Sequence, residues 1–293
     1  MTAFALLVVG LIVGSFLNVL SIRYKEGGRI FTKDTLVGRS ACRKCGKNLA
    51  WYELLPIISF AIQLGKCRKC RAKLSWQYPL IEILCAGWTL LIPIFLFNFF
   101  HIRALGLSAT QLWPFFLFVG AWTLVGYTLV LMSLIDLRLS IIPDQINVFL
   151  LFLGAVVVAL KAMFASIFIH SGSFLGPYGS FLEILSNVWL ASIAAAILAA
   201  MIFGAIILIS RGQGMGMGDL KLIFPLGLVV GWPDVILVIS LSFIIGSLIS
   251  LPSLLMDKKK LKSAVPFGPF IALAVFATII GGQVIAQWYF ALI

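Results

Sequence analysis

Residues 182–209 read LEILSNVWLASIAAAILAAMIFGAIILI, a stretch whose only charged residue is Glu183. An α-helix needs about 20 apolar residues to cross the hydrocarbon core of a bilayer, so this stretch predicts a transmembrane helix. The whole chain has the same character, because 62% of its 293 residues are hydrophobic and 11% are charged. Soluble domains have about 45–50% apolar and about 25% charged residues, which excludes an ordinary soluble enzyme, a disordered protein and a secreted disulfide scaffold. Unbroken apolar runs also argue against a membrane β-barrel, whose strands alternate.

Apolar stretches of this kind recur along the chain and predict an all-α polytopic membrane protein with about eight transmembrane helices. They cover residues 2–22, 79–100, 112–135, 146–169, 182–209, 220–232, 235–256 and 264–292. The first stretch differs from a cleavable signal peptide, because its basic residues follow it instead of preceding it. The stretch 220–232 is too short for a straight crossing, so we expect it to be tilted, re-entrant or packed inside the bundle.

Lysine and arginine outnumber aspartate and glutamate by 22 to 10, for a net charge of +12. Thirteen of the basic residues lie between Arg23 and Lys73, and residues 258–262 contain four more lysines. Both groups border apolar stretches, as the positive-inside rule expects of cytoplasmic loops. The same topology leaves the outer loops almost free of basic residues, with Arg103 as the main exception. The basic excess therefore indicates membrane orientation in preference to nucleic acid binding.

Residues 23–78 form one sizeable polar insert, which we predict to be a domain between a first helix at 1–22 and a helical bundle at 79–293. The insert contains Cys42-Arg-Lys-Cys45 and Cys67-Arg-Lys-Cys70. Two CxxC pairs at this spacing can place four thiolates around Zn²⁺, and four sulfur ligands leave no open position for a substrate, so we expect structural zinc. Two disulfides or a redox-active CxxC are alternatives, although a reducing cytoplasm disfavours disulfides. The fifth cysteine, Cys85, falls inside a predicted helix and is expected to act as a small apolar residue.

Acidic residues are scarce, and an aspartate at the bilayer centre costs about 2.5–3.5 kcal/mol on insertion scales. Asp136 ends the third apolar stretch and Asp219 precedes the sixth, so the predicted topology brings both to the cytoplasmic boundary. Two neighbouring carboxylates can share one proton and serve as general base and general acid. Gly216 and Gly218 lie just before Asp219 and allow a close backbone approach. Read singly, either aspartate could instead mark a helix end, since Arg138 can balance Asp136 and the helix dipole favours an acid in a first turn.

The remaining acids near apolar stretches have several interpretations. Asp144 follows Pro143 and reads first as a helix cap and second as an accessory acid. Glu82 lies a turn inside the second apolar stretch, where it could serve a second chemistry or pair with a basic residue. Asp234 and Glu183 are expected at the outer interface or in helix caps.

Several motifs follow one another along the chain. They are Gly14-Ser15-Phe16-Leu17-Asn18-Val19, the paired CxxC insert with Trp51, Pro56 and Ser59, Tyr78-Pro79-Leu80-Ile81-Glu82, Ile135-Asp136, Ile142-Pro143-Asp144, Met217-Gly218-Asp219-Leu220-Lys221-Leu222 and Pro266-Phe267-Gly268-Pro269-Phe270. Taken in order, these motifs resemble those of the type IV prepilin peptidases, which are bifunctional membrane aspartic proteases of the GxGD class. The resemblance covers nearly the whole chain, and the ordered set is far more specific than any one of its motifs.

The resemblance implies an enzyme of the bacterial cytoplasmic (inner) membrane, with the insert and the catalytic loops on the cytoplasmic side. Such an enzyme removes the basic leader of prepilins and pseudopilins and then N-methylates the new N-terminal residue with S-adenosylmethionine. It implies Asp136 and Asp219 as the catalytic pair and links the zinc insert to methyl transfer. The accessory candidates are Asp144, Gly216, Gly218, Lys221 and Glu82. The sequence shows no glycine-rich fingerprint for the methyl donor, so the residues that bind it are not assigned.

Two other functional classes fit part of the pattern. A transporter or proton-coupled carrier could use the acids as a relay and the zinc insert as a regulatory module. Such proteins often have inverted repeats with paired broken helices, and this chain has no matching second half. A membrane scaffold could instead dock partners through the insert.

Overall fold

The computed structural model describes residues 2–30, 32–36, 38–102, 109–163, 172–182, 185–256 and 265–291. Over these residues the protein is helical, with two isolated β-bridges in the insert. The chain divides into two compact units, Met1–Ile94 and Phe95–Ile293. The predicted basic cluster at 258–262 and the expectations for Arg103 and Glu183 fall outside the described residues.

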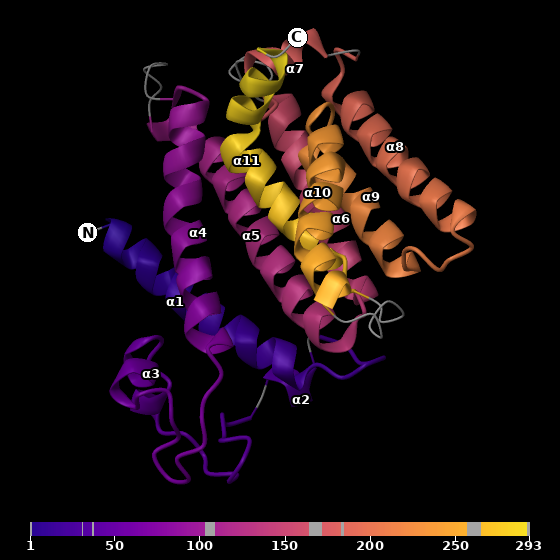
Figure 1. Cartoon of the computed structure of the whole chain (residues 1–293). Coiled ribbons are helices and arrows are strands. Elements are labelled where there is room, and N and C mark those ends of the chain that lie inside the picture. The colour runs from indigo at the N-terminus through magenta and orange to yellow at the C-terminus, as the bar shows by residue number, and fades with distance from the viewer. Residues whose placement is uncertain are drawn as a thin grey trace. The chain divides into compact units, whose positions relative to one another are not determined.

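The first unit consists of two long helices joined by the insert (Figure 1). Its elements are α1 (Thr2–Arg23), α2 (Lys33–Leu36), η1 (Trp51–Glu53), α3 (Ile58–Ile62) and most of α4 (Gln77–Phe99). Glycines bring α1 against α4, because a Cβ on Gly10 would lie 2.5 Å from the Cα of Ala86, and one on Gly14 would lie 2.8 Å from the Cα of Glu82. Small residues of this kind let transmembrane helices approach closely.

The second unit is a helical bundle. Its helices are α5 (Ala109–Leu139), α6 (Asp144–Met163), α7 (Pro177–Phe181), α8 (Val188–Ile209), α9 (Met217–Val230), α10 (Asp234–Met256) and α11 (Gly268–Phe290). Helix α5 packs against α6 and α11, α11 packs against α10, and α9 packs against both α6 and α8 (Figure 1). The core contains an aromatic cluster in which Phe100, Phe118 and Trp122 are fully buried and Phe174 packs edge-on against Trp122.

Seven helices in the described part of the chain are long and apolar enough to cross a membrane. These spans are Ala3–Arg23, Gln77–Phe99, Leu112–Leu139, Asp144–Met163, Val188–Ile209, Asp234–Leu251 and Gly268–Phe290. They correspond to seven of the predicted stretches and confirm the all-α membrane architecture.

The short stretch 220–232 forms α9, which has 14 residues. At 1.5 Å per residue it is about 21 Å long, shorter than the apolar core of about 30 Å. Of the expected arrangements, packing inside the bundle is the one observed, since Leu222, Ile223 and Leu226 are buried. A Cβ on Gly227 would lie 2.7 Å from the Cα of Ala196, so glycine allows α9 to touch the backbone of α8.

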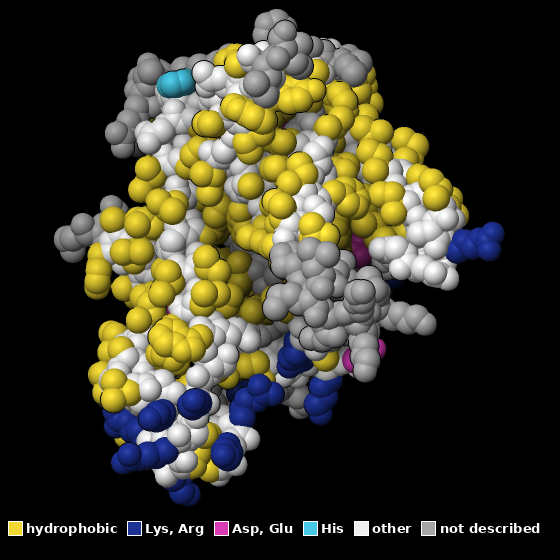
Figure 2. All heavy atoms as spheres, viewed as in Figure 1, with side chains coloured by type: hydrophobic (Ala, Val, Ile, Leu, Met, Phe, Trp, Pro, Cys, Tyr) yellow, Lys and Arg dark blue, Asp and Glu magenta, His cyan; other side chains and the backbone are white. Residues whose placement is uncertain are grey.

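The outward faces of the helices are apolar. Figure 2 shows hydrophobic side chains over the helices, with lysine and arginine gathered on the insert. Single exposed leucines are ordinary, but apolar side chains here are exposed along whole helices, as for Leu248 and Leu251 on α10 and Val284 and Trp288 on α11. Such a surface fits lipid and not water. The chain is therefore a multi-pass membrane protein.

Asp234 corrects one expectation from the sequence. It does begin α10, but it is fully buried instead of lying at an interface. Its carboxylate accepts hydrogen bonds from the Ser173 hydroxyl at 2.7 Å and from the Phe174 N–H at 3.1 Å. Lys161 is buried nearby and donates to the Val230 carbonyl at 3.2 Å. The carboxylate thus anchors the segment before α7, a contact between distant residues that a linear pattern does not reveal.

Candidate active site and metal centre

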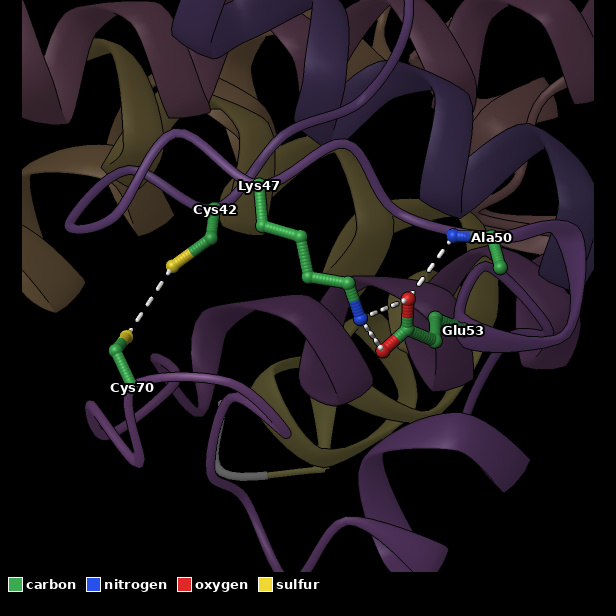
Figure 3. Close-up of polar contacts among 5 residues, drawn as sticks. All are labelled: Cys42, Lys47, Ala50, Glu53 and Cys70. Carbon is green, nitrogen blue, oxygen red and sulfur yellow. Dashed lines mark hydrogen bonds and ion pairs between the residues drawn. The ribbon is translucent and has the colours of Figure 1, made fainter.

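The four cysteines of the insert converge. Their sulfur atoms all lie within 4.8 Å of one another, and the Sγ atoms of Cys42 and Cys70 are 3.8 Å apart (Figure 3). A tetrahedral zinc with Zn–S bonds of about 2.3 Å has sulfur–sulfur edges of about 3.8 Å, so the donor set fits the metal. All five cysteines are free thiols, and Cys85 is buried in α4 away from this cluster, as expected. The insert therefore contains a four-cysteine cluster that could bind a metal.

Two turns of the same geometry present these cysteines. In each turn the first cysteine donates its N–H to a carbonyl five residues later, Cys42 to Lys47 and Cys67 to Ala72, both at 2.9 Å. The equivalent closing positions, Gly46 and Arg71, have φ values of +68° and +54°. Glycine adopts this left-handed conformation freely, whereas arginine does so at a cost.

Glu53 supports the first turn, a role that the sequence did not indicate. The Lys47 ammonium lies 3.2 Å from its carboxylate, which also accepts the Ala50 N–H at 2.9 Å (Figure 3). The Ala50 hydrogen bond, followed by the contacts with Lys47, lowers the pKa of Glu53 against the opposing effect of burial. Glu53 is thus ionised and joins the cysteine turn to η1.

Asp136 lies near the end of α5 and is buried, with 4% of its surface exposed. The backbone N–H of Gly268, at the start of α11, donates to its Oδ2 atom at 3.0 Å. A Cβ on Gly268 would lie 2.7 Å from the same oxygen, so this contact requires glycine. The sequence drew attention to the Gly268 motif but not to this hydrogen bond. The carboxylate is therefore held in place by a segment that is remote in sequence.

Asp219 occupies the first turn of α9, before the buried part of that helix. Its Oδ2 atom accepts the Gly216 N–H at 3.3 Å, and Gly218 packs against Ile142, where a Cβ would lie 3.5 Å from the side chain. Burial, followed by the negative charge of Asp136, raises the pKa of Asp219 to about 6. The charge of Asp136 thus acts on Asp219, and the pairing of the two aspartates in catalysis stays a prediction.

The other acidic candidates are Asp144 in the second unit and Glu82 in the first. Asp144 is the first residue of α6, and its exposed carboxylate forms an ion pair with Lys221 at 2.9 Å. Glu82 belongs to the first unit, where it is buried and accepts the Ile57 N–H at 2.8 Å. Among the described residues no lysine or arginine forms an ion pair with Glu82, so the pairing considered from the sequence is not observed.

An apolar groove of about 700 Å³ lies among α6, α8 and α9. Val148, Leu151 and Phe224 contribute to its walls, and Asp144 and Asn147 line it as well. Asn147 is 8% exposed, and neither its amide nitrogen nor its carbonyl oxygen has a hydrogen-bond partner among the described residues. A buried amide without partners is costly and uncommon, so this residue is a functional candidate that the sequence did not reveal.

Two segments of the chain match known protein families. Residues 8–96 match the Bacterial Peptidase A24 N-terminal domain, and residues 122–251 match the Type IV leader peptidase family. The four cysteines fall in the first match, and Asp136 and Asp219 fall in the second. The chain belongs to the type IV leader peptidase family.

Relatives in this family resemble the chain over nearly its full length. Proteins named prepilin leader peptidase/N-methyltransferase include one from Stutzerimonas stutzeri, which is 30% identical over 97% of this chain and 92% of its own length. The protein of that name from Pseudomonas aeruginosa strain PAO1 is 29% identical over 97% and 91%, and one from Burkholderia pseudomallei strain 1026b is 31% identical over 96% and 85%. No solved structure matches the chain. The family resemblance predicted from the motifs is confirmed.

Proposed function

We propose that this protein removes the basic leader peptide of type IV prepilins and pseudopilins as an aspartic endopeptidase, and then methylates the new N-terminal amine. The feature that supports the peptidase most directly is the effect of Asp136 on Asp219, since burial and the negative charge of Asp136 raise the pKa of Asp219 to about 6. Paired aspartates that influence each other's ionisation are the basis of aspartic protease chemistry. The relatives' name, prepilin leader peptidase/N-methyltransferase, supports both activities.

In the proposed peptidase step the two aspartates share one proton. The Gly268 N–H stabilises negative charge on Asp136, and the raised pKa of Asp219 favours its protonated form. Asp136 accepts a proton from water as the water oxygen attacks the peptide carbonyl carbon, while Asp219 donates its proton to the carbonyl oxygen. Collapse breaks the C–N bond, returns a proton to Asp219 and transfers the proton held by Asp136 to the leaving amine.

The groove among α6, α8 and α9 is a suitable place for the apolar segment that follows the leader. It includes Leu220 and Lys221, which directly follow Asp219, so a helix lying in it would end near the catalytic turn. The unpaired amide of Asn147 can donate a hydrogen bond to a peptide unit of the substrate and accept one from it. In this view Asp144 and Lys221 border the same path as accessory groups.

We place the enzyme in the bacterial cytoplasmic membrane, with the insert at 23–78 and the aspartates on the cytoplasmic side. The concentration of basic residues in the insert supports this orientation. Anionic lipid beside this surface would attract the basic leader toward the membrane face where the aspartates lie.

Metal and methyl donor have separate roles in the proposal. Cys42, Cys45, Cys67 and Cys70 would hold a structural zinc, which stabilises an insert too small to bury a large core. S-adenosylmethionine supplies a methyl carbon attached to a sulfonium. The neutral N-terminal amine attacks that carbon, the N–C bond forms as the S–C bond breaks, the sulfur leaves as a neutral thioether, and the amine then releases one proton to solvent.

The decisive experiment is cleavage of a purified prepilin in detergent by the wild type and by Asp219→Ala, with the mass of the product measured. The wild type should yield a shortened product that gains one methyl group when S-adenosylmethionine is present. Asp219→Ala should insert in the membrane and retain zinc but leave the prepilin intact. Normal cleavage by this variant would refute the assignment of the aspartate pair, and an unmethylated wild-type product would refute the transferase half.

A further inference from the structure

The first unit contains a cavity of about 380 Å³ that the peptidase chemistry does not use. Its walls come from α1, from the insert and from the start of α4, and they include Ser15, Cys42, Phe60, Tyr78 and Glu82. This volume is within the range of about 300–1,000 Å³ that is usual for small-molecule sites. The cavity lies within residues 8–96, outside the part of the chain that matches the leader peptidase family.

Glu82 is the buried charge in this cavity. Only 5% of its surface is exposed, and its carboxylate accepts a hydrogen bond from the Ile57 N–H at 2.8 Å. Among the residues that the structure describes, no lysine or arginine forms an ion pair with it. A carboxylate removed from water without a cation is unfavourable, so a positively charged ligand would supply the missing partner.

The backbone that holds Glu82 is strained. Ile57, whose N–H makes the hydrogen bond, has a φ of +60° and directly precedes α3. A β-branched residue in this left-handed region is a genuine outlier, and such strain persists only where the surrounding structure enforces it. The chain therefore accepts an unfavourable conformation at the residue that positions the carboxylate.

The rest of the cavity offers groups of a different kind. Arg39, Arg43 and Lys73 line it and are exposed, so they can meet a negatively charged group, while Phe60 and Tyr78 provide aromatic faces. A ligand that suits the whole site carries a cation, a carboxylate and a flat ring. A sulfonium amino acid joined to a nucleoside has all three, and that is the chemistry of S-adenosylmethionine.

We propose that this cavity is the methyl-donor site and that Glu82 binds the positive charge of S-adenosylmethionine. The proposal rests on the methyl transfer proposed above and locates it in the first unit. Glu82 is then a binding residue for the donor, while the cysteine cluster stabilises the cavity wall that contains Cys42 and Cys67.

The test measures binding, not turnover. Radiolabelled S-adenosylmethionine is titrated by equilibrium dialysis against the full-length, zinc-loaded protein in detergent. Glu82→Gln keeps the shape of the side chain and should weaken binding by about tenfold or more, because hydrogen bonds and ion pairs to charged groups contribute that much. Glu26→Gln removes the same charge from an exposed position of the same unit and should bind like the wild type.

A second variant tests the cavity without changing Glu82, and its zinc content shows whether the insert is still folded. Ser59→Phe adds bulk to the cavity lining while leaving Glu82 and the cysteines in place, and it should also lose donor binding while retaining one zinc per chain. Repeating the titration with S-adenosylhomocysteine, which lacks the sulfonium charge, tells which cation Glu82 meets. A selective loss for S-adenosylmethionine in Glu82→Gln indicates the sulfonium, and an equal loss for both indicates the amino group.

Wild-type affinity in both Glu82→Gln and Ser59→Phe would overturn the site. A wild-type protein that cleaves prepilin but does not bind the donor would overturn it as well, while leaving the peptidase intact. A protein that binds the donor through Glu82 but does not cleave would instead count against the proposed peptidase.

Discussion

Replacing Gly268 with alanine should disable Asp136 without removing any charged group. The Gly268 N–H donates to the Asp136 carboxylate at 3.0 Å, and a Cβ at this position would lie 2.7 Å from the same oxygen and 2.7 Å from the Met132 sulfur. The methyl group must displace the carboxylate, α11 or both. Gly268 does not have a positive φ, so the backbone itself can accept alanine and the effect comes from the contact with Asp136.

The size of the effect follows from the bond that is lost. A hydrogen bond to a charged group contributes about 1.5–3 kcal/mol, which corresponds to about a 10- to 150-fold fall in cleavage rate if the transition state uses it. Overpacking adds a destabilisation of about 1–3 kcal/mol. Both are measurable by prepilin cleavage on a gel and by thermal unfolding of the detergent-solubilised protein.

A matched control lies on α5, the helix that contains Asp136. A Cβ on Gly120 would meet no atom within 4 Å, so Gly120→Ala should cleave at the wild-type rate and unfold at the same or a slightly higher temperature. Gly268→Ala with wild-type cleavage would refute the reasoning. A loss of activity in both variants would show that helix glycines matter for another reason than contact with Asp136.

Three further predictions concern other parts of the molecule. Because the folded state holds the Asp219 proton more tightly than the unfolded chain, the carboxyl reduces stability as pH rises from 3.8 to about 6. Asp219→Asn should therefore abolish cleavage yet raise the temperature of thermal unfolding above that pH range, and a lower unfolding temperature there would contradict the sign. Cys67→Ser should lose bound metal, whereas Cys85→Ser should retain it, because Cys85 lies outside the cysteine cluster. Metal content is measured by mass spectrometry of the purified proteins, and equal content in the two variants would refute the cysteine cluster as the metal site. Asn147→Leu removes an amide without partners, so thermal stability should be unchanged or higher while prepilin cleavage falls; full activity would remove Asn147 from the substrate path.

Several features were predictable from the sequence because their signals are local. A span depends on the apolar content of one continuous stretch, so seven of the spans could be predicted with ends within about six residues of those observed. The cysteine cluster depends on two short motifs, each of which forms a turn through hydrogen bonds between neighbouring residues. The hydrogen bonds of Cys42 and Cys67 are examples. The aspartate pair could be inferred because topology alone restricts both residues to one membrane face. Their catalytic roles stay a prediction.

Contacts between segments that are remote in sequence could not be predicted in this way. Asp234 shows the limit, since its position at a helix start suggested an interface, whereas it is fully buried and accepts hydrogen bonds from Ser173 and Phe174. Glu53 is similar, because its role depends on Lys47 reaching across a turn. The sequence shows that burying a polar side chain would cost free energy, but it does not show which residue will be its hydrogen-bond partner.

The sequence by itself determined a charge-poor helical membrane protein, the cysteine-bearing insert and a short set of acids in costly positions. These follow from transfer free energies and motif spacing, which depend on residues close in the chain. Only the tertiary structure decided that the Gly268 N–H holds Asp136, that Asn147 lies unpaired in an apolar groove, and that a strained Ile57 positions Glu82 in a cavity. Each of these depends on where a backbone approaches a side chain, and packing sets that distance, which composition and periodicity do not specify.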